Sequence, residues 1–199
     1  GYNLEVFADK NYLVEHINSL ISNVNDVELL NASIVVLNIG ANDLIIAEAR
    51  DSSTTELQEV KEKLISLIKL TCDRFQESHI VVNSVLPLNG ILKFNESALF
   101  VNEGIGLLPK DLLENVTFID HTENFMKGQD VNSELMSESN VLKEAGLKCF
   151  LSEIGKEITN HVKKAEMLMS ESDKIENEAQ IDSSKHVVNA TKVSATLPV

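Results

Sequence analysis

A short polar segment follows an apolar run of β-type residues. Residues 34–39 are apolar except for Asn38, and they lead directly into Gly40-Ala41-Asn42-Asp43. In open α/β sheets, ligands bind at the carboxyl ends of the strands, so this segment is well placed to meet a substrate. The NH2 group of Asn42 could stabilise an oxyanion, and loss of one such donor typically lowers turnover about 10²–10³-fold. Gly, Asn and Asp are also common in turns. The tetrapeptide alone therefore fits either a turn or an oxyanion-binding site.

The elements that must position this segment follow from the apolar pattern. Residues 32–37 and 80–85 are short, β-branched and nearly uncharged, as in strands buried on both faces, and residues 116–120 add a third strand. Apolar residues at helical spacing predict helices that begin near residues 12, 54 and 143. Gly104 and Gly106 predict the end of a shorter helix before them. This alternation predicts an α/β fold with a parallel sheet covered on both faces.

Three further stretches, together with the segment at Gly40, resemble the SGNH (GDSL-type) esterase and lipase superfamily. Residues 79–87 (H-I-V-V-N-S-V-L-P) are similar to its next core strand and loop, and residues 116–121 (V-T-F-I-D-H) to the following strand. Residues 142–146 (L-K-E-A-G) are similar to the block that opens its final helix.

This resemblance covers about residues 30–160. It implies a three-layer sandwich with a parallel sheet, flavodoxin-like and of the SGNH hydrolase type, whose first strand lies upstream of Gly1. It also implies that Gly40 and Asn42 correspond to the oxyanion hole. Asp43 is expected to brace the loop by accepting backbone N–H bonds.

The catalytic residues of that superfamily are absent from the aligned positions. Alignment on residues 142–146 places the catalytic histidine at Val141 and its aspartate at Glu138. Valine cannot carry a proton, and the nucleophilic Gly-Asp-Ser segment occurs nowhere in the 199 residues. Loss of any triad member leaves only residual catalysis. We therefore expect an inactive binding or scaffold module that takes a small acyl ester or a protein partner. The alternative is a fragment of an active ester hydrolase whose serine lies upstream.

Other candidate residues carry weaker signals. Asp120 and His121 suggest a catalytic pair, but successive strand residues point to opposite faces and cannot easily bond each other. The remaining four histidines lack metal-ligand spacing, so no metal and no cofactor is expected. Cys72 and Cys149 fit buried thiols in a reduced compartment, which slightly favours a cytoplasmic location.

Composition limits the partners and the domain organisation. The chain has 31 acidic and 17 basic residues and a net charge of −14, which disfavours binding to a phosphate backbone. No apolar run approaches the ~18 residues of a membrane span. The length predicts one domain over residues 1–169. Residues 170–199 lose the apolar stripe and predict an acidic, disordered tail.

Overall fold

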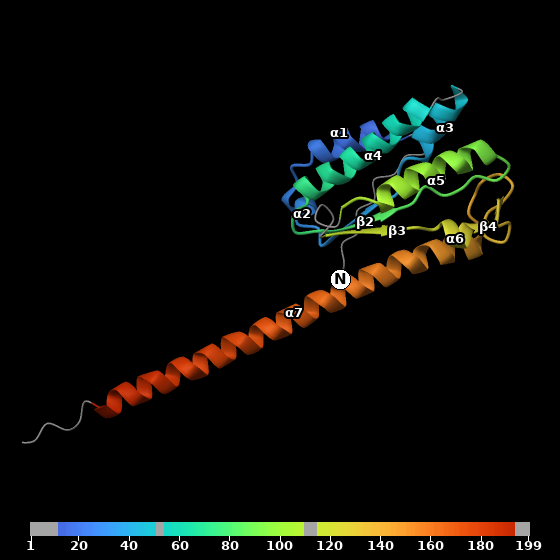
Figure 1. Ribbon diagram of the computed structural model, residues 1–199. Helices are drawn as coiled ribbons and strands as arrows, with labels where there is room; N and C mark the ends of the chain where they lie inside the picture. The colour runs from blue at the N-terminus through green and yellow to red at the C-terminus, as the bar shows by residue number, and fades with distance from the viewer. Residues whose placement is uncertain (1–11, 51–53, 110–114, 194–199) are drawn as a thin grey trace, which may run out of the picture. The chain divides into compact units, whose positions relative to one another are not determined.

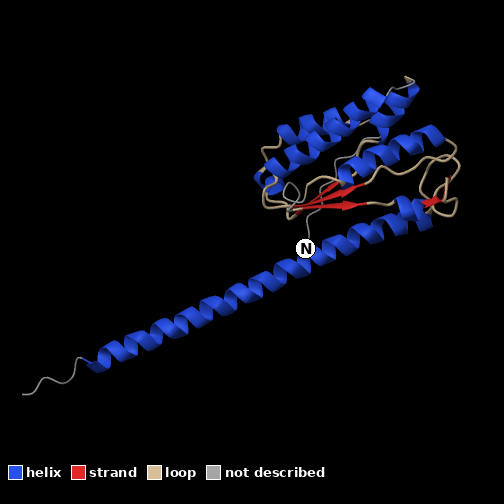
Figure 2. Ribbon diagram, in the orientation of Figure 1, coloured by secondary structure: helices blue, strands red, loops and turns tan. Residues whose placement is uncertain are grey.

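The computed structural model describes residues 12–50, 54–109 and 115–193, with side chains as far as residue 170. Figure 1 and Figure 2 show the arrangement of its helices and strands. In chain order these are α1 (Val14–Ser22), α2 (Val27–Leu30), β1 (Ile34–Leu37), α3 (Ala41–Ala49), α4 (Thr54–Arg74), β2 (His79–Asn83), α5 (Leu92–Gly106), β3 (Val116–Ile119), α6 (Thr122–Phe125), β4 (Met126–Lys127), β5 (Asp130–Val131) and α7 (Glu144–Val193).

The three longer strands form a parallel sheet in the order β1-β2-β3. Val36 of β1 lies opposite Val81 of β2, and Val82 of β2 lies opposite Phe118 of β3. The prediction of a mixed α/β fold with these three runs as neighbouring parallel strands is therefore confirmed. β2 ends at Asn83 rather than at residue 85, because the backbone of Val85 bonds to a side chain of α5 instead of to a strand.

The main core lies between one face of the sheet and the helices α1, α3, α4 and α5, which Figure 1 shows on one side of the strands. Leu37, Ile80 and Val82 contribute the strand side of this core, and Leu64 and Leu67 of α4 are buried against them. These helical residues are three apart, so both lie on one face of α4. The apolar stripe predicted for this helix therefore meets the sheet as expected.

The opposite face of the sheet is covered only in part. Val81 alternates with Ile80 and Val82, so it points to this face, where it is fully buried. Figure 1 shows the first turns of α7 along this side. Val36 of β1 also points this way and is 42% exposed. The prediction of a sheet buried on both faces is therefore wrong at β1, because the residues of a strand do not indicate what covers each of its faces.

Two buried asparagines of α5 hold the chain that follows β2. The Asn102 side chain accepts the N–H of Val85 at 2.9 Å and donates to its carbonyl at 3.0 Å. Asn95 does the same for Leu88, at 2.7 and 3.0 Å. The two asparagines are seven residues apart and therefore share one helix face. Together they give the backbone of Val85 and Leu88 the hydrogen bonds that a neighbouring strand would otherwise supply, and so fix residues 85–88 along α5.

The helix α5 is longer than the glycine pattern predicts. It continues through Gly104 and ends at Gly106, with Ile105 buried in the core. A Cβ on Gly104 would lie 2.3 Å from Cδ of Lys61. The glycine therefore serves the close approach of a lysine side chain from α4, and it does not end the helix.

The chain divides into two compact units, residues 1–157 and 158–199. α7 continues to Val193, so the backbone of residues 170–193 is helical where composition predicts a disordered tail. Residues 156–197 contain no glycine or proline, the two residues that most disfavour a helix. Across the described ranges, none of the helices combines the length and apolarity that a membrane span requires.

Replacing Asn102 with Ala should destabilise the protein, because the N–H and carbonyl of Val85 would stay buried without partners. An unsatisfied buried group costs about 1–3 kcal/mol, so we expect a loss of about 2–4 kcal/mol in the free energy of unfolding. Urea denaturation followed by circular dichroism measures this loss. The exposed neighbour provides the control, since Glu103→Ala should change stability by less than about 0.5 kcal/mol. Equal effects of the two substitutions would contradict the bridging role.

Candidate functional site

The turn between β1 and α3 depends on Gly40. This residue is the N-cap of α3 and has φ = 112°, in the left-handed region that favours glycine. It is also enclosed, because an added Cβ would lie 3.0 Å from Leu64 and 3.3 Å from Val85. The apolar run of β1 thus turns sharply into α3 at the carboxyl end of the sheet, and Asn42 and Asp43 occupy the first turn of that helix.

The amide of Asn42 contacts backbone rather than an open crevice. Its Nδ2 donates a hydrogen bond of 2.9 Å to the carbonyl of Tyr12, and the contact is partly buried. At least one hydrogen of the predicted oxyanion donor is therefore used within the protein. The bond joins the first turn of α3 to the chain that enters α1.

Asp43 supplies a helix cap that α1 cannot make for itself. The N-cap of α1 is Leu13, which has no side-chain oxygen, and the N–H of Val14 is bonded instead by Asp43 Oδ2 at 3.1 Å. A negative charge at a helix N-terminus is also favourable for the helix dipole. Burial raises the pKa of Asp43, and the bond from the Val14 N–H opposes this increase in part. The carboxylate therefore accepts a backbone N–H bond, and the donor is the first residue of α1.

Glu138 and Val141 lie in the loop that precedes α7. Glu138 is exposed, and the Val141 side chain is 62% exposed. The backbone of Val141 is fixed by Ser137, whose Oγ accepts its N–H at 3.0 Å and whose N–H donates to its carbonyl at 2.9 Å. Asn140, with φ = 59°, accepts the N–H of Asn89 from the segment after β2. The position aligned with a catalytic base thus carries an apolar side chain at the surface.

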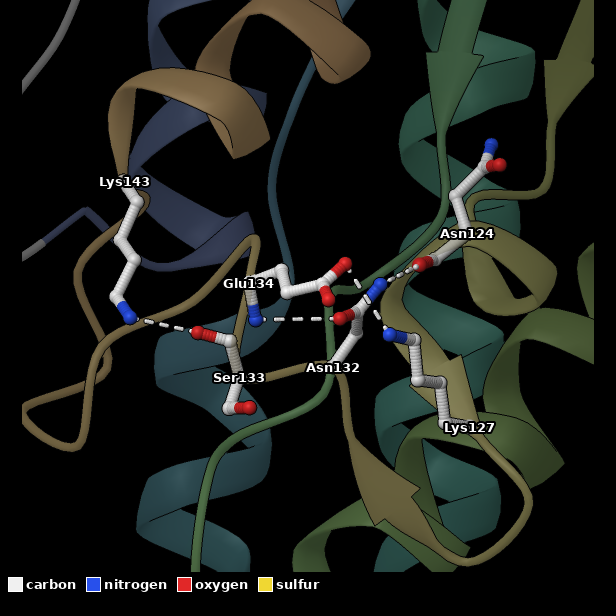
Figure 3. A network of polar contacts seen from close by, with 6 residues as sticks. All are labelled: Asn124, Lys127, Asn132, Ser133, Glu134 and Lys143. Carbon is white, nitrogen blue, oxygen red and sulfur yellow. Dashed lines mark hydrogen bonds and ion pairs between the residues drawn. The ribbon is translucent and has the colours of Figure 1, made fainter.

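A network of polar contacts holds together residues 124–136, called the lobe below, which precede this loop (Figure 3). It consists of Asn124, Lys127, Asn132, Ser133, Glu134 and Lys143. Asn132 is central, since its amide donates to the carbonyl of Asn124 at 3.1 Å and its Oδ1 accepts the N–H of Glu134 at 3.2 Å. Lys143 Nζ donates to the carbonyl of Ser133 at 2.6 Å. The lobe is therefore tied to the residue immediately before α7.

The first turn of α7 also packs directly on this lobe. A Cβ on Gly146 would lie 2.1 Å from the carbonyl oxygen of Leu135, so only glycine fits without displacement of backbone. The backbone of Lys143 donates to the same carbonyl at 2.9 Å. Close packing against Leu135 thus explains the presence of glycine at position 146, independently of any catalytic function.

A second polar group at the carboxyl end of the sheet was not predicted from the sequence. The Asn83 amide donates to the carbonyl of Leu37 at 3.4 Å, so its Oδ1 faces His121 Nε2 at 2.9 Å. This orientation assigns the proton to Nε2, which donates to Asn83. Ser84 Oγ accepts the backbone N–H of His121 at 3.0 Å. One chain of hydrogen bonds therefore crosses the ends of β1, β2 and β3.

The His121 ring is fully buried between aromatic side chains. Its centroid lies 4.5 Å from that of Phe150 on α7 and 6.1 Å from that of Phe125 on α6. Burial lowers the pKa of His121, and the carboxylates of Glu153 and Asp120 oppose this decrease in part. Within the described part of the chain, Nδ1 has no hydrogen-bond partner. The ring is neutral at pH 7 for these reasons.

Asp120 and His121 do not form a catalytic pair. Asp120 is exposed and its Oδ1 accepts the N–H of Thr122 at 2.9 Å, whereas the His121 ring is turned inward. The two side chains are separate, as expected, but not through strand alternation, because β3 ends at Ile119 and His121 is the N-cap of α6. Asn83, a polar residue that ends an otherwise apolar run, was the sequence signal for the actual partner of His121.

This edge of the sheet therefore has polar groups that bond mainly to one another. A fully buried His121 cannot reach a reacting atom of a ligand at the surface. The described residues also contain no group of three or more His, Cys, Asp or Glu side chains that could hold a metal ion. Neither models of known protein families nor curated protein sequences match this chain.

Replacing Asp43 with Ala should destabilise α1 by about 0.5–2 kcal/mol, the usual cost of losing an N-cap acceptor. Asp43→Asn provides the matched comparison, because its Oδ1 can still accept the Val14 N–H and it removes a charge that burial disfavours. We expect thermal denaturation to show a clear loss for the alanine variant and a smaller one for the asparagine variant. A larger loss with asparagine than with alanine would contradict the capping role.

Replacing Gly146 with Ala should destabilise the junction of α7 and the lobe by about 1–3 kcal/mol, the usual cost of forced overpacking. Gly155→Ala is the control on the same helix, since a Cβ there meets no described atom within 4 Å. That variant should be more stable by about 0.5–1 kcal/mol, because alanine is the better helix former. Chemical denaturation of both variants tests this difference in sign, and a stabilised Gly146→Ala variant would show that the contact is absent.

Proposed function

We propose that this chain is a catalytically inactive module of the SGNH type that acts by binding, with a small acyl ester or a protein as its partner. The parallel order β1-β2-β3 supports this proposal, because the aligned segments follow one another as neighbouring strands. The sharp turn at Gly40 into α3, and the segment 142–146 at the start of α7, agree with it as well. The finer assignment to a three-layer, flavodoxin-like sandwich belongs to the same proposal.

The single observation that carries the proposal is the exposed valine at position 141. A general base must hold a proton and lie within hydrogen-bond reach of the group it activates. The Val141 side chain cannot hold a proton, and the His121 imidazole at the carboxyl edge of the sheet is buried and bonded to Asn83. The bond from Asn42 to the Tyr12 carbonyl gives this amide a structural function that does not require catalysis.

A second candidate function is that of an active ester hydrolase whose nucleophile lies in another segment. The placement of Gly40 and Asn42 at the carboxyl end of β1 favours it, since oxyanion donors of α/β enzymes occupy such positions. Even so, a serine supplied from elsewhere would still lack the base at position 141. The inactive module is therefore the preferred function.

Hydrolysis of p-nitrophenyl acetate separates the two functions. The purified chain should release nitrophenol no faster than its Asn42→Ala and Val141→His variants, because none of them has both a nucleophile and a base. Asn38→Ala, at an exposed asparagine of the same loop, is the matched control, and circular dichroism verifies that each variant is folded.

Turnover near the enzyme median of about 10 s⁻¹ that falls in Asn42→Ala but not in Asn38→Ala would exclude the inactive module. Turnover gained on Val141→His would also exclude it, since a nucleophile would then lie within reach of position 141.

A further inference from the structure

The carboxyl end of β3 places an ionisable ring at the contact between the sheet and α7. His121 is fully buried, and the Phe150 ring of α7 lies over it at 4.5 Å. On its other side the ring donates to Asn83, which belongs to the central strand β2. One side of this imidazole is thus attached to the sheet and the other is covered by the helix.

This enclosure fits the neutral ring and not the protonated one. In the neutral form Nε2–H donates to Asn83, and Nδ1 carries no hydrogen. Protonation adds a hydrogen to Nδ1, which has no hydrogen-bond partner in the described structure. A buried donor without an acceptor is costly, and a buried charge is more costly still.

Among the described residues, two carboxylates act on the His121 ring. Glu153 lies one turn beyond Phe150 on α7 and is paired with Lys156 at 2.7 Å. Asp120 directly precedes His121 in the sequence and is exposed to solvent. From β2, the neutral side chain of Asn83 bonds the ring, and the neutral Ser84 that follows bonds the His121 backbone. The two carboxylates favour the imidazolium, but desolvation outweighs them.

We propose that His121 is a pH-sensitive latch: in its neutral form it holds residues 144–157 of α7 against the sheet, and its protonation releases them. The sheet side of the contact cannot easily move away from His121, because Asn83 and Ser84 lie at the end of β2, which is paired with a strand on each edge. On the helix side, the Phe150 ring lies over the imidazole at 4.5 Å, so separation of α7 uncovers the His121 ring. This inference does not depend on the SGNH resemblance or on the proposed function.

The direction of the pH dependence follows from the depressed pKa of His121. The closed state binds fewer protons than the open state, so closure is fully stable above the ordinary value of 6.5 and weakens as the pH falls below it. Between the two pKa values, the equilibrium constant for opening rises by up to about tenfold per pH unit. The lobe should move with α7, because Lys143 and Gly146 tie it to the first turn.

Hydrogen–deuterium exchange of the full chain at pH 7.5, 6.5 and 5.5, corrected for intrinsic exchange rates, tests the latch. Protection of residues 144–157 should fall by up to about tenfold between pH 6.5 and 5.5, whereas that of residues 79–83 should not. His121→Gln retains an N–H donor without titrating and should abolish the fall. His79→Gln, at the start of β2, is the matched control and should retain it.

Two results would overturn the proposal: an equal loss of protection in the strands and in α7, which indicates global unfolding, or an unchanged pH dependence in His121→Gln. Glu153→Gln provides an independent test should His121→Gln fail to fold. Without that carboxylate the closed-state pKa is lower, so the fall should continue to a lower pH than in the parent protein. A pH profile identical to that of the parent would contradict the latch.

Discussion

The hydrogen bond between His121 and Asn83 is the contact on which both sides of the sheet depend. Asn83 reaches the end of β1 through the Leu37 carbonyl, and His121 extends the same chain of bonds from the end of β3. Phe150 covers the ring from α7. This polar chain links the ends of the three strands that the described residues contribute to the sheet, and Phe150 joins it to α7. Its members are buried, so each bond has to be satisfied internally.

The same principle governs the rest of the carboxyl edge. Asparagine and aspartate side chains here bond to backbone groups that regular secondary structure leaves without partners. Asn102 and Asn95 bond the backbone of Val85 and Leu88, which have no strand partner, and Asp43 accepts the N–H of Val14 at the start of α1. Asn42 joins α3 to the chain before α1. An edge that in many α/β proteins is free to bind ligands is, in this protein, largely occupied by its own backbone.

The covering of the second face has a consequence for stability. α1, α3, α4 and α5 share the main apolar core with the sheet, whereas the buried residues of α7, Phe150 and Ile154, lie outside that core, and Phe150 packs on an ionisable ring. Elements with few buried apolar contacts open at lower free energy than the global unfolding of the protein. A change of charge at His121 therefore acts at the contact between α7 and the sheet.

The sequence by itself determined the three runs that form the parallel sheet and the main helices between them, but not α2, α3, α6 or the β4–β5 pair. Buried β-branched runs such as residues 80–83 and the apolar stripe of α4 are local patterns with periods of about 2 and 3.6, and they depend on nearby residues alone. Only the tertiary structure decided the partners of the polar side chains. His121 bonds Asn83 across 38 positions and Asn42 bonds Tyr12 across 30, and no local pattern encodes contacts between residues so far apart in the chain. The exposure of Val36 was likewise decided by the tertiary structure, because a strand shows which residues share a face but not what covers that face.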